Sequence, residues 1–196
     1  MQNTQTSSYN NENQDLLAVQ ETLQGNKQAF TAIVERYTPL IYSLSYRMLG
    51  NSEEAEDAVQ EIFLRVYRSL SKFRLSKRFY PWMYTIALNW LRSCLKKRKK
   101  KKESPDLNDP KAVEYIQQKD IGPQEKLEQQ EGERLAQEAI SMLRPEYRGV
   151  FILRHIHGFS TADVAEILHL PEGTVKTYLH RSRKALVESL KNAGWY

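Results

Sequence analysis

The residues best suited to bind a ligand are hydrogen-bond donors on the last predicted helix. At about 100° per residue, the apolar residues Val175, Leu179 and Leu186 gather on one side of this helix. Donors at helical spacing can contact base edges and phosphates in a DNA major groove. The alternative is an ordinary amphipathic helix whose basic side faces water. The donors, which fall on the opposite side, are Lys176, Thr177, His180, Arg181 and Lys184.

The segment before this helix favours the DNA-binding interpretation. Ser160 begins a short helix and Asp163 stands three residues later, which is the spacing of a capping box. A turn of His169-Leu-Pro follows. A short capped helix, a turn and a second helix form a helix-turn-helix, the motif that places its second helix in the major groove. Residues 160–186 therefore predict a DNA-binding element.

A second candidate surface combines aromatic and basic residues over Phe73–Leu91 and the adjacent Arg92. Aromatic rings can stack unpaired bases while cations hold the phosphates, at about 1–3 kcal/mol per base. The alternative is that the rings form the core of a first domain, which we expect for some of them, Trp82 included. Seven consecutive Lys or Arg residues at 96–102 follow and favour phosphate contact. The cluster comprises Phe73, Arg74, Lys77, Arg78, Phe79, Tyr80, Trp82, Tyr84, Trp90 and Arg92.

One side of the helix predicted after Gly50 is acidic. Asn51 can cap this helix, with Glu54 three residues further on. Its apolar stripe includes Ile62 and Val66, and acidic residues lie on the other side. Such a side either faces water or docks a positively charged protein partner. Its polar residues centre on Asp57, Gln60 and Glu61.

The sequence contains no motif of an enzyme or a metal site. His155-x-His157 has no Cys or carboxylate partner at ligand spacing. The single cysteine, Cys94, excludes a disulfide framework and indicates an intracellular protein. No glycine-rich phosphate-binding motif occurs. We therefore expect no cofactor and no metal, and no membrane insertion, because no apolar run approaches the ~20 residues of a spanning helix.

Charge and periodicity divide the 196 residues into two basic parts around an acidic segment. Residues 1–102 carry 17 basic and 9 acidic side chains, residues 103–138 carry 4 and 10, and residues 139–196 carry 8 and 5. Helical spacing of apolar residues without sustained alternation predicts an all-α fold of two small helical domains. The expected parts are a disordered tail at 1–14, a domain at 15–102, a flexible acidic linker at 103–132 and a helix-turn-helix domain at 133–196.

Glycine and proline residues set the expected helix ends. Gly25 and Gly50 are expected to end helices, and Pro39 to break or offset the helix between them. A basic loop at 71–78 leads to a helix whose first turn holds Pro81. Helical periodicity resumes near Glu125 after the linker.

Four sequence motifs stand in order along nearly the whole chain. They are Gly50-Asn-x-Glu-Glu-Ala-Glu-Asp-Ala-Val-Gln-Glu, Tyr80-Pro-Trp-Met-Tyr-Thr-Ile-Ala-Leu-Asn-Trp, Leu143-Arg-Pro-Glu-Tyr-Arg and Gly158-Phe-Ser-Thr-Ala-Asp-Val-Ala-Glu-Ile-Leu, the last followed by Pro171-Glu-Gly-Thr-Val-Lys. Their order and spacing resemble the extracytoplasmic-function sigma factors, group four of the sigma-70 family. The chain departs from that pattern at Tyr80, where a small hydroxyl residue is usual.

The resemblance implies two helical domains, sigma-2 and sigma-4, and no catalysed reaction, because the chemistry belongs to RNA polymerase. It implies a bacterial cytoplasmic protein that binds core RNA polymerase at the β′ clamp helices and the β flap, promoter DNA and an anti-sigma factor. The sigma-4 helix-turn-helix would bind the −35 element through the donors named above. The residues implied in docking the clamp helices are Glu54, Asp57, Gln60 and Glu61.

The resemblance also assigns sigma-2 the opening of the −10 element. A loop at 73–79 would receive a flipped base, Asn89 would lie beside that pocket, and Arg92 and Ser93 would face the duplex upstream. Flipping a base costs a few kcal/mol, so we expect the isolated chain to bind promoter DNA weakly. The residues implied in −10 binding and melting are Phe73, Arg74, Lys77, Phe79, Trp82, Asn89, Arg92 and Ser93.

Two other functions compete with a sigma initiation factor. A dimeric helix-turn-helix transcriptional regulator would explain residues 160–186 but not the aromatic and basic first domain or its acidic helix face. A nucleic-acid enzyme is opposed by the lack of carboxylate and metal-ligand constellations.

Overall fold

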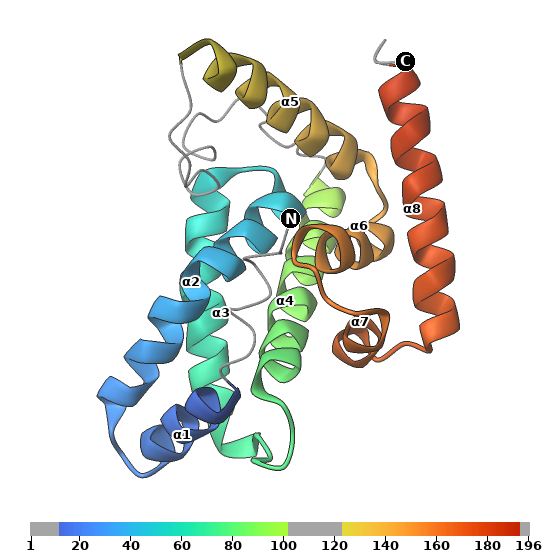
Figure 1. Ribbon diagram of the computed structural model, residues 1–196. Helices are drawn as coiled ribbons and strands as arrows, with labels where there is room; N and C mark the ends of the chain where they lie inside the picture. The colour runs from blue at the N-terminus through green and yellow to red at the C-terminus, as the bar shows by residue number, and fades with distance from the viewer. Residues whose placement is uncertain (1–11, 102–122, 193–196) are drawn as a thin grey trace.

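The computed structural model describes residues 12–101 and 123–192, and all the regular secondary structure in these two ranges is helical, as predicted. The first helical group stands on the left of Figure 1, where α2, α3 and α4 lie side by side above α1. No helix of the described ranges combines the length and apolarity needed to cross a membrane. This group consists of α1 (Glu12–Leu23), α2 (Lys27–Leu49), α3 (Ser52–Ser69), the 3-10 turn η2 (Leu70–Lys72) and α4 (Phe79–Lys101).

The second helical group packs against α4, with α8 as its outermost helix (Figure 1). Its first helix begins at Pro123, close to the expected resumption near Glu125, so residues 123–132 of the predicted linker are helical. The rest of that linker lies outside the described residues. The group consists of α5 (Pro123–Met142), α6 (Pro145–Phe151), the π-turn η4 (Ile152–Ile156), α7 (Thr161–Leu168) and α8 (Glu172–Asn192).

The expected disorder of residues 12–14 is wrong, because α1 begins at Glu12. Buried Asp15 accepts a hydrogen bond of 2.5 Å from the Tyr37 hydroxyl and pairs with Arg36. The Gln14 side chain accepts from the same guanidinium at 3.1 Å. The polar composition of this segment suggested disorder, but these groups bind α2 instead. The remaining tail, residues 1–11, lies outside the described residues.

The prediction that Pro39 breaks its helix is also wrong, since α2 continues from Lys27 to Leu49. An interior proline costs about 3 kcal/mol through its missing N–H and its steric clash. Fully buried Ile33, Ile41 and Leu44 lie on either side of Pro39, and each large apolar side chain gains about 1.5–3 kcal/mol on burial. Packing of α2 therefore outweighs the local defect.

Most other helix ends follow the sequence. The N–H of Gly50, in the left-handed conformation at φ 75°, donates to Tyr46 at 2.7 Å and ends α2. The Asn51 side chain then accepts from the N–H of Glu54 at 2.8 Å and begins α3. Pro81 lies in the first turn of α4, as expected.

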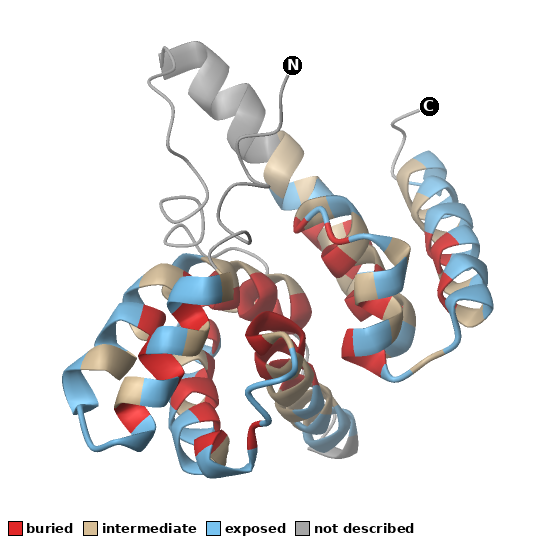
Figure 2. Cartoon of the chain, turned by 60° about the horizontal axis from the view of Figure 1, so that its bottom comes forward, coloured by how far each residue is buried: buried red, intermediate tan, exposed pale blue. Residues whose placement is uncertain are grey.

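The two helical groups share one continuous cluster of buried side chains. Figure 2 shows buried residues along the facing sides of both groups. Phe79 and Tyr84 of α4 are both fully buried, Phe79 against Tyr37 of α2 and Tyr84 against Phe159 of the second group. The helix α4 is therefore part of the core of both groups.

Buried polar contacts connect the groups at a second place, the end of α2. Arg148 of α6 donates to the carbonyl of Met48 and to the carbonyls of Ser141 and Leu143. Burial, and then the positive charge of Arg98, lowers the pKa of Arg148 to about 10, so the side chain stays charged at neutral pH. One guanidinium thus satisfies carbonyls at the ends of helices from both groups.

His157 is buried where the groups meet. The π-turn η4 ends with the N–H of His157 donating to Ile152 at 2.9 Å, and the Nδ1 atom of His157 pairs with the Tyr84 hydroxyl at 3.0 Å. Burial, and then the positive charge of Arg47, lowers the pKa of His157 to about 3. His157 is therefore neutral in the folded protein at physiological pH.

The buried histidine predicts a stability that falls with acidification. An exposed histidine in the unfolded chain binds its proton near pH 6.5, whereas His157 stays neutral down to about pH 3. Between these values the unfolded chain binds one more proton, so the free energy of unfolding should fall by about 1.4 kcal/mol per pH unit lost. Urea denaturation from pH 7 to 5 should show this slope reduced in His157→Gln.

Substitution of an exposed histidine supplies the control for this measurement. His180 lies exposed on α8, so His180→Gln should leave the slope unchanged. Equal slopes in His157→Gln and the unsubstituted chain would contradict the assignment.

Candidate nucleic-acid interface and docking face

Residues 160–186 form the predicted helix-turn-helix. The Ser160 hydroxyl accepts from the N–H of Asp163 at 3.0 Å, and Asp163 Oδ2 accepts from the N–H of Ser160 at 3.1 Å, which confirms the capping box. His169 ends α7 in the left-handed conformation at φ 51°. This turn directs the chain into α8, which packs on α6 and α7 through Val175 and Leu179.

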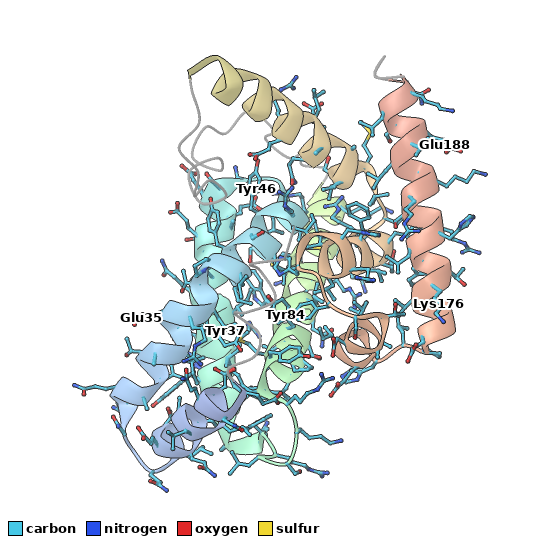
Figure 3. The ribbon with its side chains drawn as sticks, in the orientation of Figure 1. Glu35, Tyr37, Tyr46, Tyr84, Lys176 and Glu188 are labelled. Carbon is cyan, nitrogen blue, oxygen red and sulfur yellow. The ribbon has the colours of Figure 1, made fainter. Side chains whose placement is uncertain are left out.

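The donors predicted on α8 share one exposed side of the helix. Figure 3 shows Lys176 near the start of α8 and Glu188 towards its far end, both on its outer side. Val175, Leu179 and Ser182 are buried on the opposite side, so the predicted division of the helix is confirmed. The exposed donors are Lys176, Thr177, His180, Arg181 and Lys184.

Arg181 already has a partner on the protein surface. Its Nη1 atom donates to the Tyr147 hydroxyl of α6 at 3.2 Å. This hydrogen bond lowers the pKa of Tyr147. The Tyr147 ring packs edge-on against Tyr178 at 5.0 Å. The contact is exposed, so it orients the guanidinium without removing it from the outer face of α8.

The aromatic residues of the second cluster are mostly core residues. Phe73 is 7% exposed and Phe79 0%. Their ring centroids lie 5.6 Å apart, and Trp82, half-buried, lies 5.0 Å from Phe73 and 5.8 Å from Phe79. Phe79 therefore has no free face for a base in this conformation, and the three rings support the loop at 73–78 from beneath.

The polar residues of this cluster divide into exposed and covered positions. Arg74, Lys77, Asn89 and Ser93 are exposed. The Ser93 hydroxyl donates to the backbone carbonyl of Asn89 at 2.8 Å. This hydrogen bond does not involve the side-chain amide of Asn89. Arg92 instead lies against the second group, and burial lowers the pKa of its guanidinium. A Cβ added to Gly149 of α6 would lie 3.7 Å from Arg92 Nη2.

Arg78 and Tyr80 were not assigned a contact from the sequence, and both bind the helix-turn-helix. Arg78 Nη1 lies 2.6 Å from Asp163 Oδ1, and its Nη2 pairs with Glu166. The Tyr80 hydroxyl donates to Asp163 Oδ1 at 2.9 Å. Burial lowers the pKa of Arg78, but the hydrogen bonds to the carboxylates of Glu166 and Asp163 raise it by more. The net effect is a pKa above the usual value of an arginine. Residues 78 and 163 are far apart in sequence, and no local pattern signals their contact.

The acidic side of α3 is partly occupied. Asp57 and Gln60 are exposed. Arg65 Nε lies 2.7 Å from Glu61 Oε1 on the next turn. Glu54 pairs with Arg98, a member of the basic run, which also donates to the carbonyl of Leu49 at 2.7 Å.

An apolar residue missed by the sequence analysis extends this side of α3. Leu64 is 49% exposed. It stands seven residues, or two helical turns, after Asp57, so it shares the face of Asp57, Gln60 and Glu61. Its position in the helical pattern, outside the apolar stripe, could have marked it.

The structure groups no potential metal ligands within residues 12–101 and 123–192. His155 accepts from Arg183 Nε at 3.3 Å and His157 pairs with Tyr84. Cys94 is partly buried and packs against the core.

Comparison with known proteins divides the chain into the same two helical groups. Residues 33–101 match the family model described as Sigma-70 region 2, and residues 133–186 match Sigma-70, region 4. The ECF RNA polymerase sigma factor SigW of Bacillus subtilis is 34% identical, covering 89% of this chain and 95% of its own. The ECF RNA polymerase sigma-E factor of Escherichia coli (strain K12) is 30% identical, and the match covers 88% of this chain and 92% of the relative.

Two solved structures share the fold. The sigma factor RpoE of Bartonella quintana, solved with the anti-sigma factor NepR, has a TM-score of 0.59 and 25% identity, covering 84% of this chain and 96% of its own. CnrH, solved with the cytosolic domain of CnrY, has a TM-score of 0.65 at 22% identity, covering 91% and 98%.

A helical domain with an aromatic and basic loop, followed by a helix-turn-helix domain, defines a sigma-70-type protein. The chain belongs to the extracytoplasmic-function sigma factors of this family. It is a sigma initiation factor, which binds core RNA polymerase and directs it to promoters. The dimeric regulator is not favoured, because it leaves the region 2 match over residues 33–101 without a role. The first and second helical groups are named sigma-2 and sigma-4 below.

The geometry of α8 predicts different effects for two of its basic residues. Arg181→Ala should flatten the preference among −35 sequences, because a bidentate Arg–guanine contact contributes about 1–3 kcal/mol of discrimination. Lys184 lies about one turn further along the exposed side and should bind phosphate. Lys184→Ala should weaken all sequences alike and reduce the salt slope by about one unit. Binding to a −35 panel at several salt concentrations measures both.

The Tyr147 contact provides a further variant. Tyr147→Phe removes the hydrogen bond to Arg181 but keeps the ring, so it should lower discrimination less than Arg181→Ala does. If Arg181→Ala weakens every −35 sequence equally, Arg181 carries no specificity.

Proposed function

We propose that α8 contacts the −35 element, the loop at 73–78 with Asn89 opens the −10 element, and the acidic side of α3 docks the β′ clamp helices. The exposed donor side of α8, opposite a buried stripe, is the observation that supports this arrangement most directly. The buried stripe packs α8 onto the rest of the helix-turn-helix domain, and the opposite side leaves the donors exposed. Sigma-4 would also contact the β flap of the polymerase.

Promoter opening is assigned to the exposed polar residues around a rigid aromatic base. Arg74 and Lys77 supply positive charge for the phosphates of the displaced strand. Asn89 offers both a donor and an acceptor to the edge of an unpaired base. The packed rings of Phe73, Phe79 and Trp82 hold the loop in place, so their role is support unless the loop rearranges on binding.

The docking role of α3 rests on exposed charge beside an exposed apolar residue. Asp57 and Gln60 are free to contact a basic partner surface, and Leu64 adds apolar area to the same side. Glu61 forms an ion pair with Arg65, and Glu54 forms one with Arg98. We therefore expect Asp57 to contribute more than Glu54.

An anti-sigma factor is the proposed inhibitory partner. The Bartonella quintana relative was solved bound to one. The protein would act in the bacterial cytoplasm, where core polymerase works. Recovery of polymerase alone, without a small second protein, from unstressed cells would indicate control by expression instead.

Charge reversal at Asp57 and Glu61 tests the docking face. Asp57→Lys with Glu61→Lys should weaken binding of core polymerase at least tenfold, because like charges across an interface repel. Both positions point away from the core, so circular dichroism should show an unchanged fold. Affinity is measured by titrating labelled chain with core polymerase.

A matched variant controls for net charge. Glu35 is exposed on α2 and points outward (Figure 3). Glu35→Lys should leave polymerase affinity unchanged, and Asp57→Lys alone should not. Unchanged affinity in the double variant would mean that the docking face lies elsewhere.

Asn89→Ala tests the opening of the −10 element. Holoenzyme with this variant should open duplex promoters less, while binding of the −35 element stays intact. A promoter with a pre-melted −10 bubble should restore part of the activity, because the cost of unstacking has already been met. Permanganate reactivity of unpaired thymines measures opening, with Gln28→Ala on the far end of α2 as a control.

Normal thymine reactivity in the Asn89→Ala complex would count against this role. Loss of −35 binding in the same variant would indicate a structural defect rather than a defect in strand separation.

A further inference from the structure

Part of the surface proposed to bind the −10 strand is covered by sigma-4. The loop at 73–78 ends in Arg78, and Tyr80 follows in the first turn of α4. Asp163 Oδ1 lies 2.6 Å from Arg78 Nη1 and 2.9 Å from the Tyr80 hydroxyl, and Glu166 pairs with Arg78 Nη2. The cationic end of the loop is therefore paired with α7, although its side chain remains partly exposed.

Apolar packing and a backbone contact accompany these ion pairs. The ring of Phe159, just before α7, stacks on Tyr80 with a centroid distance of 5.4 Å and meets Tyr84 edge-on at 4.9 Å. Figure 3 places Tyr84 between α4 and the sigma-4 helices. The Thr85 hydroxyl lies 2.8 Å from the Ile167 carbonyl at the end of α7. The helix α7 thus covers the first two turns of α4.

The chemistry of this contact matches that of a nucleic-acid backbone. Asp163 and Glu166 stand three residues apart, so they lie on the same side of α7. Together they present anionic oxygens to one guanidinium, which binds carboxylates and phosphates through the same planar set of donors. While α7 holds Arg78, the carboxylates engage its Nη1 and Nη2 atoms and compete with a phosphate for them.

Other features of the interface favour its separation. The side chains of Arg78 and Glu166 are 40% and 42% exposed, and ion pairs this exposed are weak and screened by salt. Arg92 Nε and His157 Nε2 are buried between the regions, and neither has a hydrogen-bond partner among the described residues. Separation would return both atoms to water, which lowers its free-energy cost.

We propose that Asp163 and Glu166 compete with promoter DNA for Arg78 within the chain. In the closed form they hold Arg78 and keep sigma-4 on α4. When the two regions separate, Arg78 binds the DNA backbone beside Arg74 and Lys77. The proposal rests on the proposed role of the loop at 73–78 in binding the −10 strand.

Glu166→Gln is the cleanest variant, because Asp163 also caps α7 through Ser160 whereas the structure gives Glu166 no capping contact. Glu35→Gln on α2, an exposed position outside the proposed DNA-binding surfaces, makes the same change in net charge away from the interface. The probe is a fluorescent oligothymidine of about 12 nucleotides, a length of the order that one single-strand binding site covers. Glu166→Gln should bind it about two- to fivefold more tightly than Glu35→Gln does, the effect expected of one exposed ion pair.

Arg78→Gln tests whether the gain depends on competition. This variant should bind the probe more weakly and should cancel the gain from Glu166→Gln when the two are combined. In complex with core polymerase, Glu166→Gln should give no gain if docking has already separated the regions.

Closure itself is measured by energy transfer within the full chain. Dyes at Ser71→Cys on η2 and Asn192→Cys on α8, both exposed positions, label the two regions in a Cys94→Ser background. Transfer efficiency should change in Glu166→Gln and should stay at the unsubstituted value in Glu35→Gln.

Three results separate the possible failures. Unchanged transfer and unchanged probe affinity in Glu166→Gln, with Asn89→Ala still defective in opening, would overturn the competition and leave the proposed function standing. A gain that persists in the Arg78→Gln background would mean general repulsion by Glu166 and would also overturn it. Normal promoter opening by both Asn89→Ala and Arg78→Gln would instead remove the proposed role of the loop.

Discussion

The burial of α4 between two groups of helices is the constraint on which the other features depend. Phe79 and Tyr84 are both fully buried, yet they serve different groups: Phe79 packs on Tyr37, and Tyr84 packs on Phe159 and pairs with His157. A helix packed on one side would leave its other side free for DNA. Because α4 is packed on both, its polar residues are divided between a free set, including Asn89, and a covered set, including Arg92.

Several charged residues on or near the proposed binding surfaces also form contacts that stabilise the fold. Asp163 caps α7 and pairs with Arg78, so the first turn of the helix-turn-helix and the contact between regions share one carboxylate. Arg98 belongs to the basic run after α4, but it binds Glu54 and the end of α2. A basic run is therefore not a uniform phosphate-binding surface, because burial and pairing select which of its charges remain free.

The family assignment and the closed arrangement together describe a factor whose surfaces are not all available at once. The donor side of α8 and the acidic side of α3 are exposed while the regions remain packed. The start of α4 is not, since α7 lies on it. The proposed docking on polymerase and the proposed contact with the −35 element therefore need no separation of the regions, whereas full access to the start of α4 requires the regions to move apart.

The sequence by itself determined the helices, the capping box, the two sides of α8 and the family, because each depends on local spacing that a periodic pattern or a motif records. It left open which aromatic residues are core, and Phe73 and Phe79 proved to be buried. It misjudged Pro39 and residues 12–14, where packing against other helices outweighed local preference. Only the tertiary structure decided that Arg78 meets Asp163 and that Arg92 is covered. Such contacts join residues distant in sequence, and their energies depend on burial, which no local pattern encodes.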